Sequence, residues 1–135
     1  MKSNGIRWVF PCKVESTPSV ASLYLTLDMG LHVTHNVIVK LAGIIVPRYK
    51  DDKTPASASF VSYWLKEGMD NEEDNYKSRW PFLVETIQTK DRWVWHGAIW
   101  RCNDMSCLNR AMVTVGVASL DMETDIPALP SVDWL

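Results

Sequence analysis

The chain has 135 residues, of which 47% are apolar and 22% charged, and its formal net charge is −2. These values are typical of one folded globular domain and exclude a disordered composition. The slightly acidic balance argues against, without excluding, a protein that grips nucleic acid by its phosphates. No apolar run approaches the ~20 residues that cross a bilayer, so we expect no membrane contact. The first residues lack the apolar segment of a secretion signal, which favours a cytoplasmic location.

The cysteines and histidines do not form the pattern of a metal site. The chain has three cysteines, an odd number, and the only close pair, Cys102 and Cys107, is spaced C-x4-C with no second pair beside it. Reduced thiols in a cytoplasm are therefore expected rather than disulfides or a structural zinc ion. The sequence predicts no metal ion and no other cofactor.

Two alternating runs near the N-terminus predict a long hairpin. Residues 22–30, SLYLTLDMG, place Leu23, Leu25 and Leu27 on one face, the period of a half-buried strand, and stop at Gly30. The run HNVIVKLAGIIV, residues 35–46, is the returning strand. Pro47 ends it, because proline has no amide hydrogen for the ladder.

A helix is predicted over residues 54–68. Thr54 is suited to the N-cap, Pro55 to the first helical position and Gly68 to the C-cap. One apolar stripe, expected to face the core, runs through the helix. It consists of Ala56, Phe60 and Trp64, with Val61 and Leu65 beside them.

Two further strands and a second helix are predicted in the remainder. The strands are FLVETIQT, residues 82–89, and RWVWHGAIWR, residues 92–101, and the helix over SCLNRAMVTVGVA ends at Gly116. Residues 121–135 have no period and are expected to be extended. This order of elements predicts an α+β fold with a mostly antiparallel sheet.

Three segments in this order resemble the staphylococcal-nuclease-like (thermonuclease) family. CLNRAMVTVGVA is similar to the family's sLNeaLVreGlA, KLAGIIVP to RLaGIDaPE, and LYLTLDMG to the strand after DGDT. The resemblance covers residues 6–120. It implies an OB-type five-stranded antiparallel β-barrel with packed α-helices in one domain, residues 1–120, followed by the tail 121–135.

The resemblance also implies that the catalytic acids of the family are absent. Family members cleave phosphodiesters with a calcium ion held by two aspartates, assisted by a glutamate and by arginines on the phosphate. In this chain the matching positions of the acids hold Ala21, Ile45 and Arg48. Neither alanine nor isoleucine offers oxygen to a metal, and Arg48 would repel one. We therefore expect that the chain is not an enzyme.

A basic groove is implied where the family binds phosphate. Its expected members are Lys40, Arg48, Lys50 and Arg92, although a gap-free match would place Val94 rather than Arg92 at the last arginine. Such a groove could hold a single strand, with bases stacked on Trp93 or Trp95. These two tryptophans alternate on one strand face, which is more typical of a core or an interface.

The favoured hypothesis is a non-catalytic binding or adaptor module with a protein partner or a second copy of itself. Seven tryptophans support it, because tryptophan is enriched at binding hot spots. An inhibitor and an assembly subunit are two forms of this function. The alternatives are a module that binds single-stranded nucleic acid, and a hydrolase or metal-dependent nuclease whose acids are displaced. The acids considered for the latter are Asp28, Glu85, Asp91 and Asp104.

Overall fold

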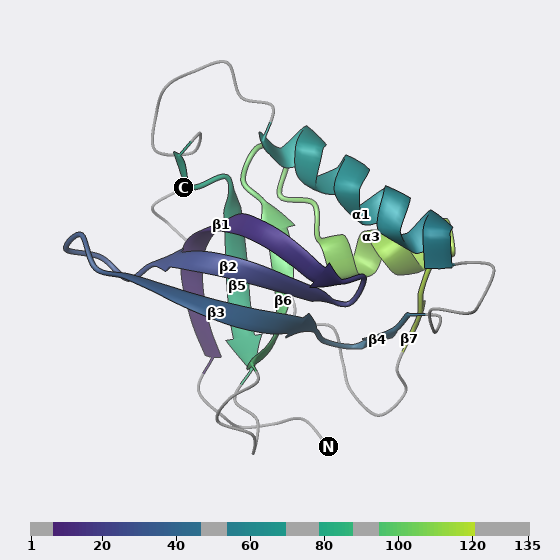
Figure 1. The fold of residues 1–135 in the computed structure, drawn as a ribbon, viewed down its shortest axis with the longest axis horizontal. Helices are drawn as coiled ribbons and strands as arrows, with labels where there is room; N and C mark the ends of the chain where they lie inside the picture. The colour runs from purple at the N-terminus through teal and green to yellow at the C-terminus, as the bar shows by residue number, and fades with distance from the viewer. Residues whose placement is uncertain (1–6, 47–53, 70–78, 88–94, 121–135) are drawn as a thin grey trace.

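The computed structural model describes residues 7–46, 54–69, 79–87 and 95–120 (Figure 1). Within them the elements follow in the order β1 (Arg7–Ser19), β2 (Ser22–Asp28), β3 (Thr34–Leu41), β4 (Ile44–Ile45), α1 (Thr54–Met69), β5 (Phe82–Ile87), β6 (Trp95–Arg101), α3 (Leu108–Val115) and β7 (Ser119–Leu120). None of these described helices is long and apolar enough to cross a bilayer.

Five strands close into a barrel in the order β1-β2-β3-β6-β5. β1 closes it by pairing with β5 through Arg7–Cys12 and with β2 from Cys12 onward. Register shifts after Val14 and Ser16 bend the second half of β1 toward β2. The sequence analysis predicted no strand here. Pro11 is tolerated because it lies in the half that pairs with β5 alone.

The barrel is mixed rather than antiparallel. β3 and β6 pair in parallel, with Val39 opposite Trp95 and Leu41 opposite Gly97, while the other barrel pairs are antiparallel. The predicted α+β barrel of five strands with a mostly antiparallel sheet is confirmed, while the antiparallel barrel that the family resemblance implied is wrong at this one pair. The reason is the long connection between the two strands, which contains α1 and lets the chain return in the same direction.

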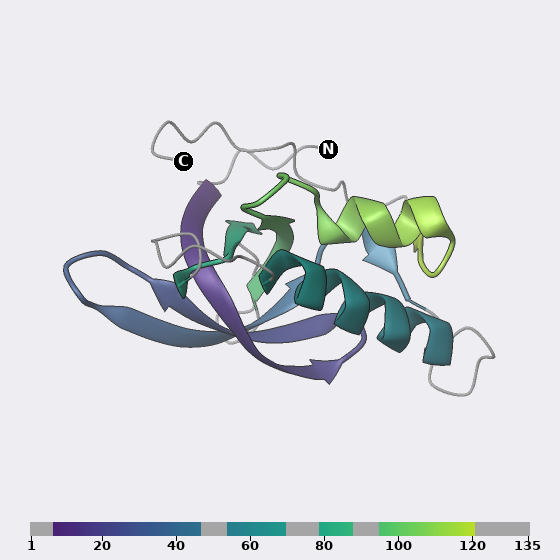
Figure 2. The same cartoon turned by 90° about the horizontal axis from the view of Figure 1, so that it is seen from above.

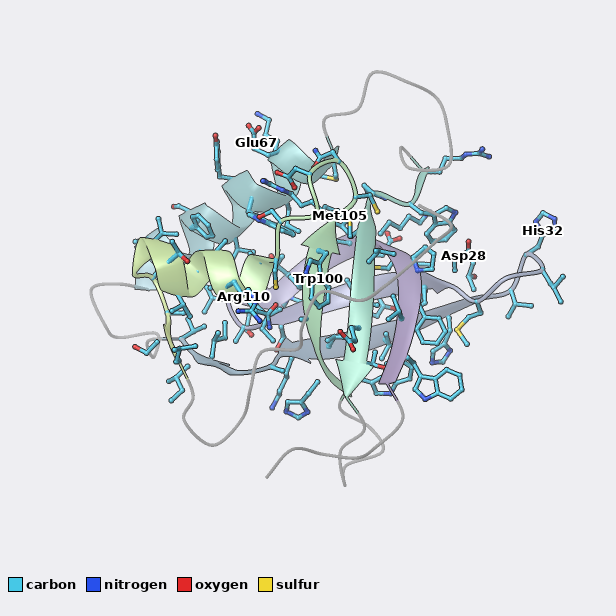
Figure 3. The ribbon with its side chains drawn as sticks, turned by 180° about the vertical axis from the view of Figure 1, so that it is seen from behind. Asp28, His32, Glu67, Trp100, Met105 and Arg110 are labelled. Carbon is cyan, nitrogen blue, oxygen red and sulfur yellow. The ribbon has the colours of Figure 1, made fainter. Side chains whose placement is uncertain are left out.

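The barrel interior is filled by alternate residues, as the strand periods predicted. Leu23, Leu25 and Leu27 of β2 are fully buried, and Val37, Val39 and Leu41 of β3 face the same core. On the outside of β5 and β6 a second apolar cluster forms around Trp100 (Figure 3). Its other buried members are Leu83, Ala98, Cys102 and Cys107.

Helix α1 covers one side of the barrel with a face slightly rotated from the predicted one (Figures 1 and 2). Ala56 is exposed, and Ser57 is buried in its place, donating from Oγ to Val117 O (2.8 Å). The prediction that Gly68 caps the C-terminus of the helix was wrong, because Gly68 lies inside α1. A Cβ there would lie 2.5 Å from Phe82 Cε1, so the glycine lets α1 approach β5 closely.

Helix α3 ends where the sequence predicted. Gly116 has φ 88°, which is the left-handed conformation that glycine adopts at a helix C-terminus. Its backbone N–H donates to Met112 O and Val113 O. At the other end, Asn109 is fully buried. Its Nδ2 donates to Ala42 O (2.8 Å) and Gly97 O (3.1 Å). This amide fastens α3 to the turn after β3 and to β6.

The β2–β3 hairpin projects beyond the barrel on the side away from the helices (Figures 1 and 2). β2 and β3 pair from Ser22 opposite Lys40 to Asp28 opposite Thr34. β1 pairs with β2 as far as Leu27, and the described part of β6 pairs with β3 from Val39 to Leu41. We call the projecting part, residues 28–38, the β2–β3 arm.

Candidate binding surface

Two positions that the family resemblance matches to metal-binding aspartates lie at one end of the barrel. Ala21 forms the turn between β1 and β2, and its carbonyl accepts from Leu41 N (2.8 Å). Ile45 lies on β4, 56% exposed, opposite Ser119 of β7. These positions present only alkyl side chains. Arg48, the third position of the match, lies outside the described residues.

Lys40 is the one member of the predicted basic groove that the described part of the chain contains. It is exposed on β3, opposite Ser22 of β2 and beside His96 of β6. Lys50, Arg92 and Trp93 lie in the ranges that the structure does not describe. The convergence of the groove cations therefore remains a prediction.

Trp95 lies at the start of β6, next to the base of the β2–β3 arm. It is half-buried and packs against the barrel core, and its ring lies 6.2 Å from the ring of His35 on β3. His35 itself is exposed. The two side chains thus form a partly covered aromatic surface where the arm leaves the barrel.

Three of the acids considered for a displaced nuclease site, Asp28, Glu85 and Asp104, lie in different parts of the fold, and the fourth, Asp91, lies outside the described residues. Asp28 Oδ1 accepts from Gly30 N (2.9 Å) at the base of the arm tip (Figure 3). Asp104, at the far end of β6, accepts from Arg101 Nη2 (2.6 Å), and this hydrogen bond lowers the pKa of the Asp104 carboxyl. Glu85 is buried on β5. Across the described residues, no three His, Cys, Asp or Glu side chains group in a way that could hold a metal ion.

The cysteines act as packing residues. All three are buried and form no disulfide. Burial raises the pKa of the Cys12 thiol well above its ordinary value, with Cys102 adding to the effect, and burial likewise raises the pKa of Cys107. A protonated, buried thiol is a poor nucleophile, so thiol chemistry is not what these positions provide.

The tip of the β2–β3 arm carries exposed apolar side chains. Met29 is 44%, Val33 55% and Leu31 96% exposed. The turn is closed by a hydrogen bond from Val33 N to Gly30 O (2.9 Å), and its central residues have positive φ, 53° at Leu31 and 64° at His32. The sequence does signal this surface, because the run MGLHV places apolar residues at a turn. The sequence analysis interpreted this run only as the end of a strand.

Leucine is an unfavourable choice at this turn for two independent reasons. Turns with two positive-φ residues favour Asn, Gly or Asp, and a left-handed conformation costs other residues about 1–2 kcal/mol. Leu31 also leaves nearly its whole side chain in water, forgoing the ~1.5–3 kcal/mol that burial of a leucine contributes. Leu31 is therefore unfavourable on both counts for the fold.

No protein-family model matches this chain, and a search of curated proteins finds no significant match. The function proposed below is therefore argued from the sequence and from the geometry of the described residues.

Proposed function

We propose that this chain is a non-catalytic binding or adaptor module, a divergent staphylococcal-nuclease-like barrel whose partner is a protein. The observation that carries the proposal is the chemistry at the positions matched to the metal-binding aspartates. Ala21 supplies a methyl group and Ile45 an exposed alkyl chain where calcium would need carboxylate oxygens. A phosphodiesterase mechanism of the family type has no metal ligands at these two places.

The arrangement of the strands supports the OB-type assignment. An OB-fold is a five-stranded Greek-key barrel, and here five strands close with one parallel contact between β3 and β6. The resemblance in CLNRAMVTVGVA gains support from Asn109, whose buried amide joins α3 to the barrel. An asparagine at this place in the motif therefore has a structural reason.

A protein partner is supported by the character of the exposed surface. Among the described residues, the large apolar side chain most open to water is Leu31 on the β2–β3 arm, and the same arm also carries the exposed Met29, Val33 and Ile38. Their burial would stabilise a complex through the hydrophobic effect, which needs no charge. A net charge of −2 agrees with a protein better than with a polyanion. The three free cysteines support a reducing, cytoplasmic compartment.

A single-stranded nucleic acid is the second candidate, favoured by one observation. Tyr24 and Lys40 lie on the outer face of β2 and β3, the face that OB-folds use for oligonucleotides. A base could stack on the tyrosine while the lysine meets a phosphate.

Fluorescence anisotropy of a labelled single strand distinguishes the two candidates. We titrate the protein into the strand at low and at physiological salt, and we expect no rise in anisotropy at physiological salt. The test variant is Lys40→Ala with Arg48→Ala, and the matched control removes two exposed cations elsewhere, Lys66→Ala with Arg110→Ala.

Binding at physiological salt that the test variant weakens more than the control would contradict the protein partner and support the second candidate. Binding that both variants weaken equally would contradict the predicted groove as well as the protein partner.

A further inference from the structure

The inner face of the barrel continues outward at the end that lies away from the helices (Figures 1 and 2). Side chains from β1, β2 and β3 pack in the core up to Phe10, Leu27 and Val37. Because successive side chains of a strand point to opposite faces, the residue two positions further out on each strand lies on the same side. These three residues are Trp8, Met29 and His35. We call the surface that they form the barrel mouth.

The barrel mouth is open to water although its side chains are apolar or aromatic. Trp8 is 56% and Met29 44% exposed. The ring of Trp8 is stacked on that of Phe10, with 6.3 Å between the ring centroids. The exposed ring of His35 lies 6.2 Å from the ring of the half-buried Trp95. Two pairs of aromatic rings thus reach the surface at this end of the barrel.

The β2–β3 arm extends this surface away from the barrel. Val33 lies two positions before His35 and therefore on the same side of the hairpin, and it is 55% exposed. Met29 N donates to Val33 O (2.9 Å), which places these two residues opposite each other. Leu31 follows at the tip and is 96% exposed. Exposed apolar side chains that gather on one surface, unlike single scattered ones, mark a site of interaction.

The described segments that form this surface carry no charge. Residues 8–10, WVF, and residues 29–38, MGLHVTHNVI, contain no Lys, Arg, Asp or Glu. Residues 88–94, between β5 and β6, lie outside the described residues. The phosphates of a nucleic acid or of lipid headgroups are usually met by Lys and Arg beside the apolar residues. A second copy of the same surface, in contrast, brings no like charge against these segments and offers them apolar side chains.

We propose that the barrel mouth and the tip of the arm bind the same surface of a second copy of this chain, forming a two-fold dimer. This inference rests on the proposed function as a binding module and names its partner. In a two-fold contact every residue of the surface is covered in both copies. The projecting tip of each arm then meets the aromatic side chains at the mouth of the other copy. Leu31 is covered there, although the monomer exposes it at a left-handed turn position.

The extent of the surface predicts a weak dimer. Its exposed apolar side chains come from the start of one strand and from one hairpin, which is fewer than the roughly 20–30 residues that each partner gives to a standard interface. Interfaces below about 1,200 Å² in total are typical of transient complexes. We therefore expect a monomer–dimer equilibrium with a dissociation constant in the micromolar range.

Analytical ultracentrifugation from micromolar to millimolar concentration measures this equilibrium. We expect the unmodified chain to shift from 15.4 kDa toward twice that mass as concentration rises. A single 15.4 kDa species at all concentrations overturns the proposal.

The variant Leu31→Asn tests the contact of the tip without endangering the fold. Asparagine is favoured at a positive φ, so we expect a thermal midpoint that is unchanged or higher. Loss of the apolar contact should make the dimer dissociate at least about 10-fold more readily. The control, Val115→Asn, changes an exposed apolar residue of α3 and should leave the dissociation constant unchanged. Equal dissociation constants for Leu31→Asn and the unmodified chain overturn the contact of the tip.

NMR of the methionine methyl groups locates the contact. Met29 lies at the barrel mouth and is 44% exposed, while Met69 lies on α1 and is 54% exposed, so the two start with similar access to water. Their resonances are assigned with Met29→Leu and Met69→Leu. As concentration rises, we expect the Met29 resonance to shift and the Met69 resonance to stay in place. A dimer that forms while the Met29 resonance does not move overturns the barrel mouth as its interface.

The outcome for the dimer and the outcome for the proposed function are measured separately. A monomeric protein that leaves nucleic acid intact keeps the binding module and loses only the second copy as its partner. A dimer that cleaves nucleic acid keeps this interface and loses the non-catalytic function.

Discussion

Asn109 is the side chain on which the attachment of α3 to the barrel depends most directly. It is fully buried. Its Nδ2 donates to Ala42 O (2.8 Å) and Gly97 O (3.1 Å), and its Oδ1 accepts from Ile99 N (3.3 Å). Asn109→Ala removes these three hydrogen bonds, and a longer one that Oδ1 accepts from Cys107 Sγ (4.0 Å), and offers the buried backbone groups no replacement.

The expected loss of stability follows from the groups left behind. In the variant, Gly97 O still accepts a hydrogen bond from Ala42 N (2.8 Å). The buried groups that lose their Asn109 partner without this compensation are therefore Ala42 O and Ile99 N. A buried polar group deprived of its partner costs about 1–3 kcal/mol, and two such groups give about 3 kcal/mol for the variant. For a domain of this size, that corresponds to a fall in thermal midpoint of about 10–15 °C.

Chemical and thermal denaturation followed by circular dichroism measure this loss, with Asn103→Ala as the matched control. Asn103 is exposed and donates a single hydrogen bond from Nδ2 to Glu67 O (2.9 Å). Its replacement should cost less than about 1 kcal/mol. Equal effects of the two substitutions would refute the reasoning, because they would show that the buried amide does not hold α3 to the barrel.

Three further predictions concern packing, pH and reactivity. Gly97→Ala should destabilise the fold by about 1–3 kcal/mol in denaturant titrations, because its Cβ would lie 2.4 Å from the backbone oxygen of Glu85; an unchanged midpoint contradicts this. The hydrogen bond from Arg101 lowers the pKa of Asp104, so its stabilisation is present above the ordinary carboxyl pKa of about 4 and is lost as pH falls below it. At neutral pH, Asp104→Asn should therefore reduce the free energy of unfolding by the roughly 0–1 kcal/mol that an exposed ion pair contributes, and lower the thermal midpoint slightly. In acid the variant and the unmodified protein should have the same midpoint. A difference in midpoint that grows in acid would contradict the lowered pKa of Asp104. Burial raises the pKa of Cys12, so a maleimide should modify it in denaturant and not in native buffer, as peptide mass mapping would show.

The sequence predicted the regular parts of the fold from periodicity. The alternation of Leu23, Leu25 and Leu27 identified the buried face of β2, and Gly116 identified the end of α3. These features depend on local pattern, which a single sequence displays. The exposed Ala56 shows the limit of such a pattern, because the rotation of a helix on its sheet is set by the residues that it meets.

The features that were missed depend on contacts between distant segments. β1 contains Pro11, and a proline argues against a strand that is paired on both sides. Only the structure shows that β2 pairs with β1 from Cys12 onward and so leaves Pro11 paired with β5 alone. Gly68 was predicted to end α1, and only the position of Phe82 shows that it is there for close packing. The length of the part of the hairpin that β1 leaves unpaired depends on the register between β1 and β2, which residues 28–38 themselves do not reveal.

The role of the candidate site remains a prediction, and only the location of some of its residues can be compared with the sequence. The sequence identified alkyl side chains at the positions matched to two acids, and the structure shows Ala21 contacting the end of β3 and Ile45 exposed on β4. The exposure and the positive φ of Leu31 could not be read from the sequence, because both emerge only from the folded turn.

The most direct test of the central claim is the length of a labelled nucleic acid after incubation with the protein and calcium. Single-stranded and duplex DNA and RNA are resolved on a denaturing gel after extended incubation, with a chelator as the parallel condition. We expect every strand to keep its full length in both conditions, because Ala21 and Ile45 cannot ligate the metal. Shortening in calcium that the chelator prevents, and that persists through further purification, would show a metal-dependent nuclease and contradict the non-catalytic function.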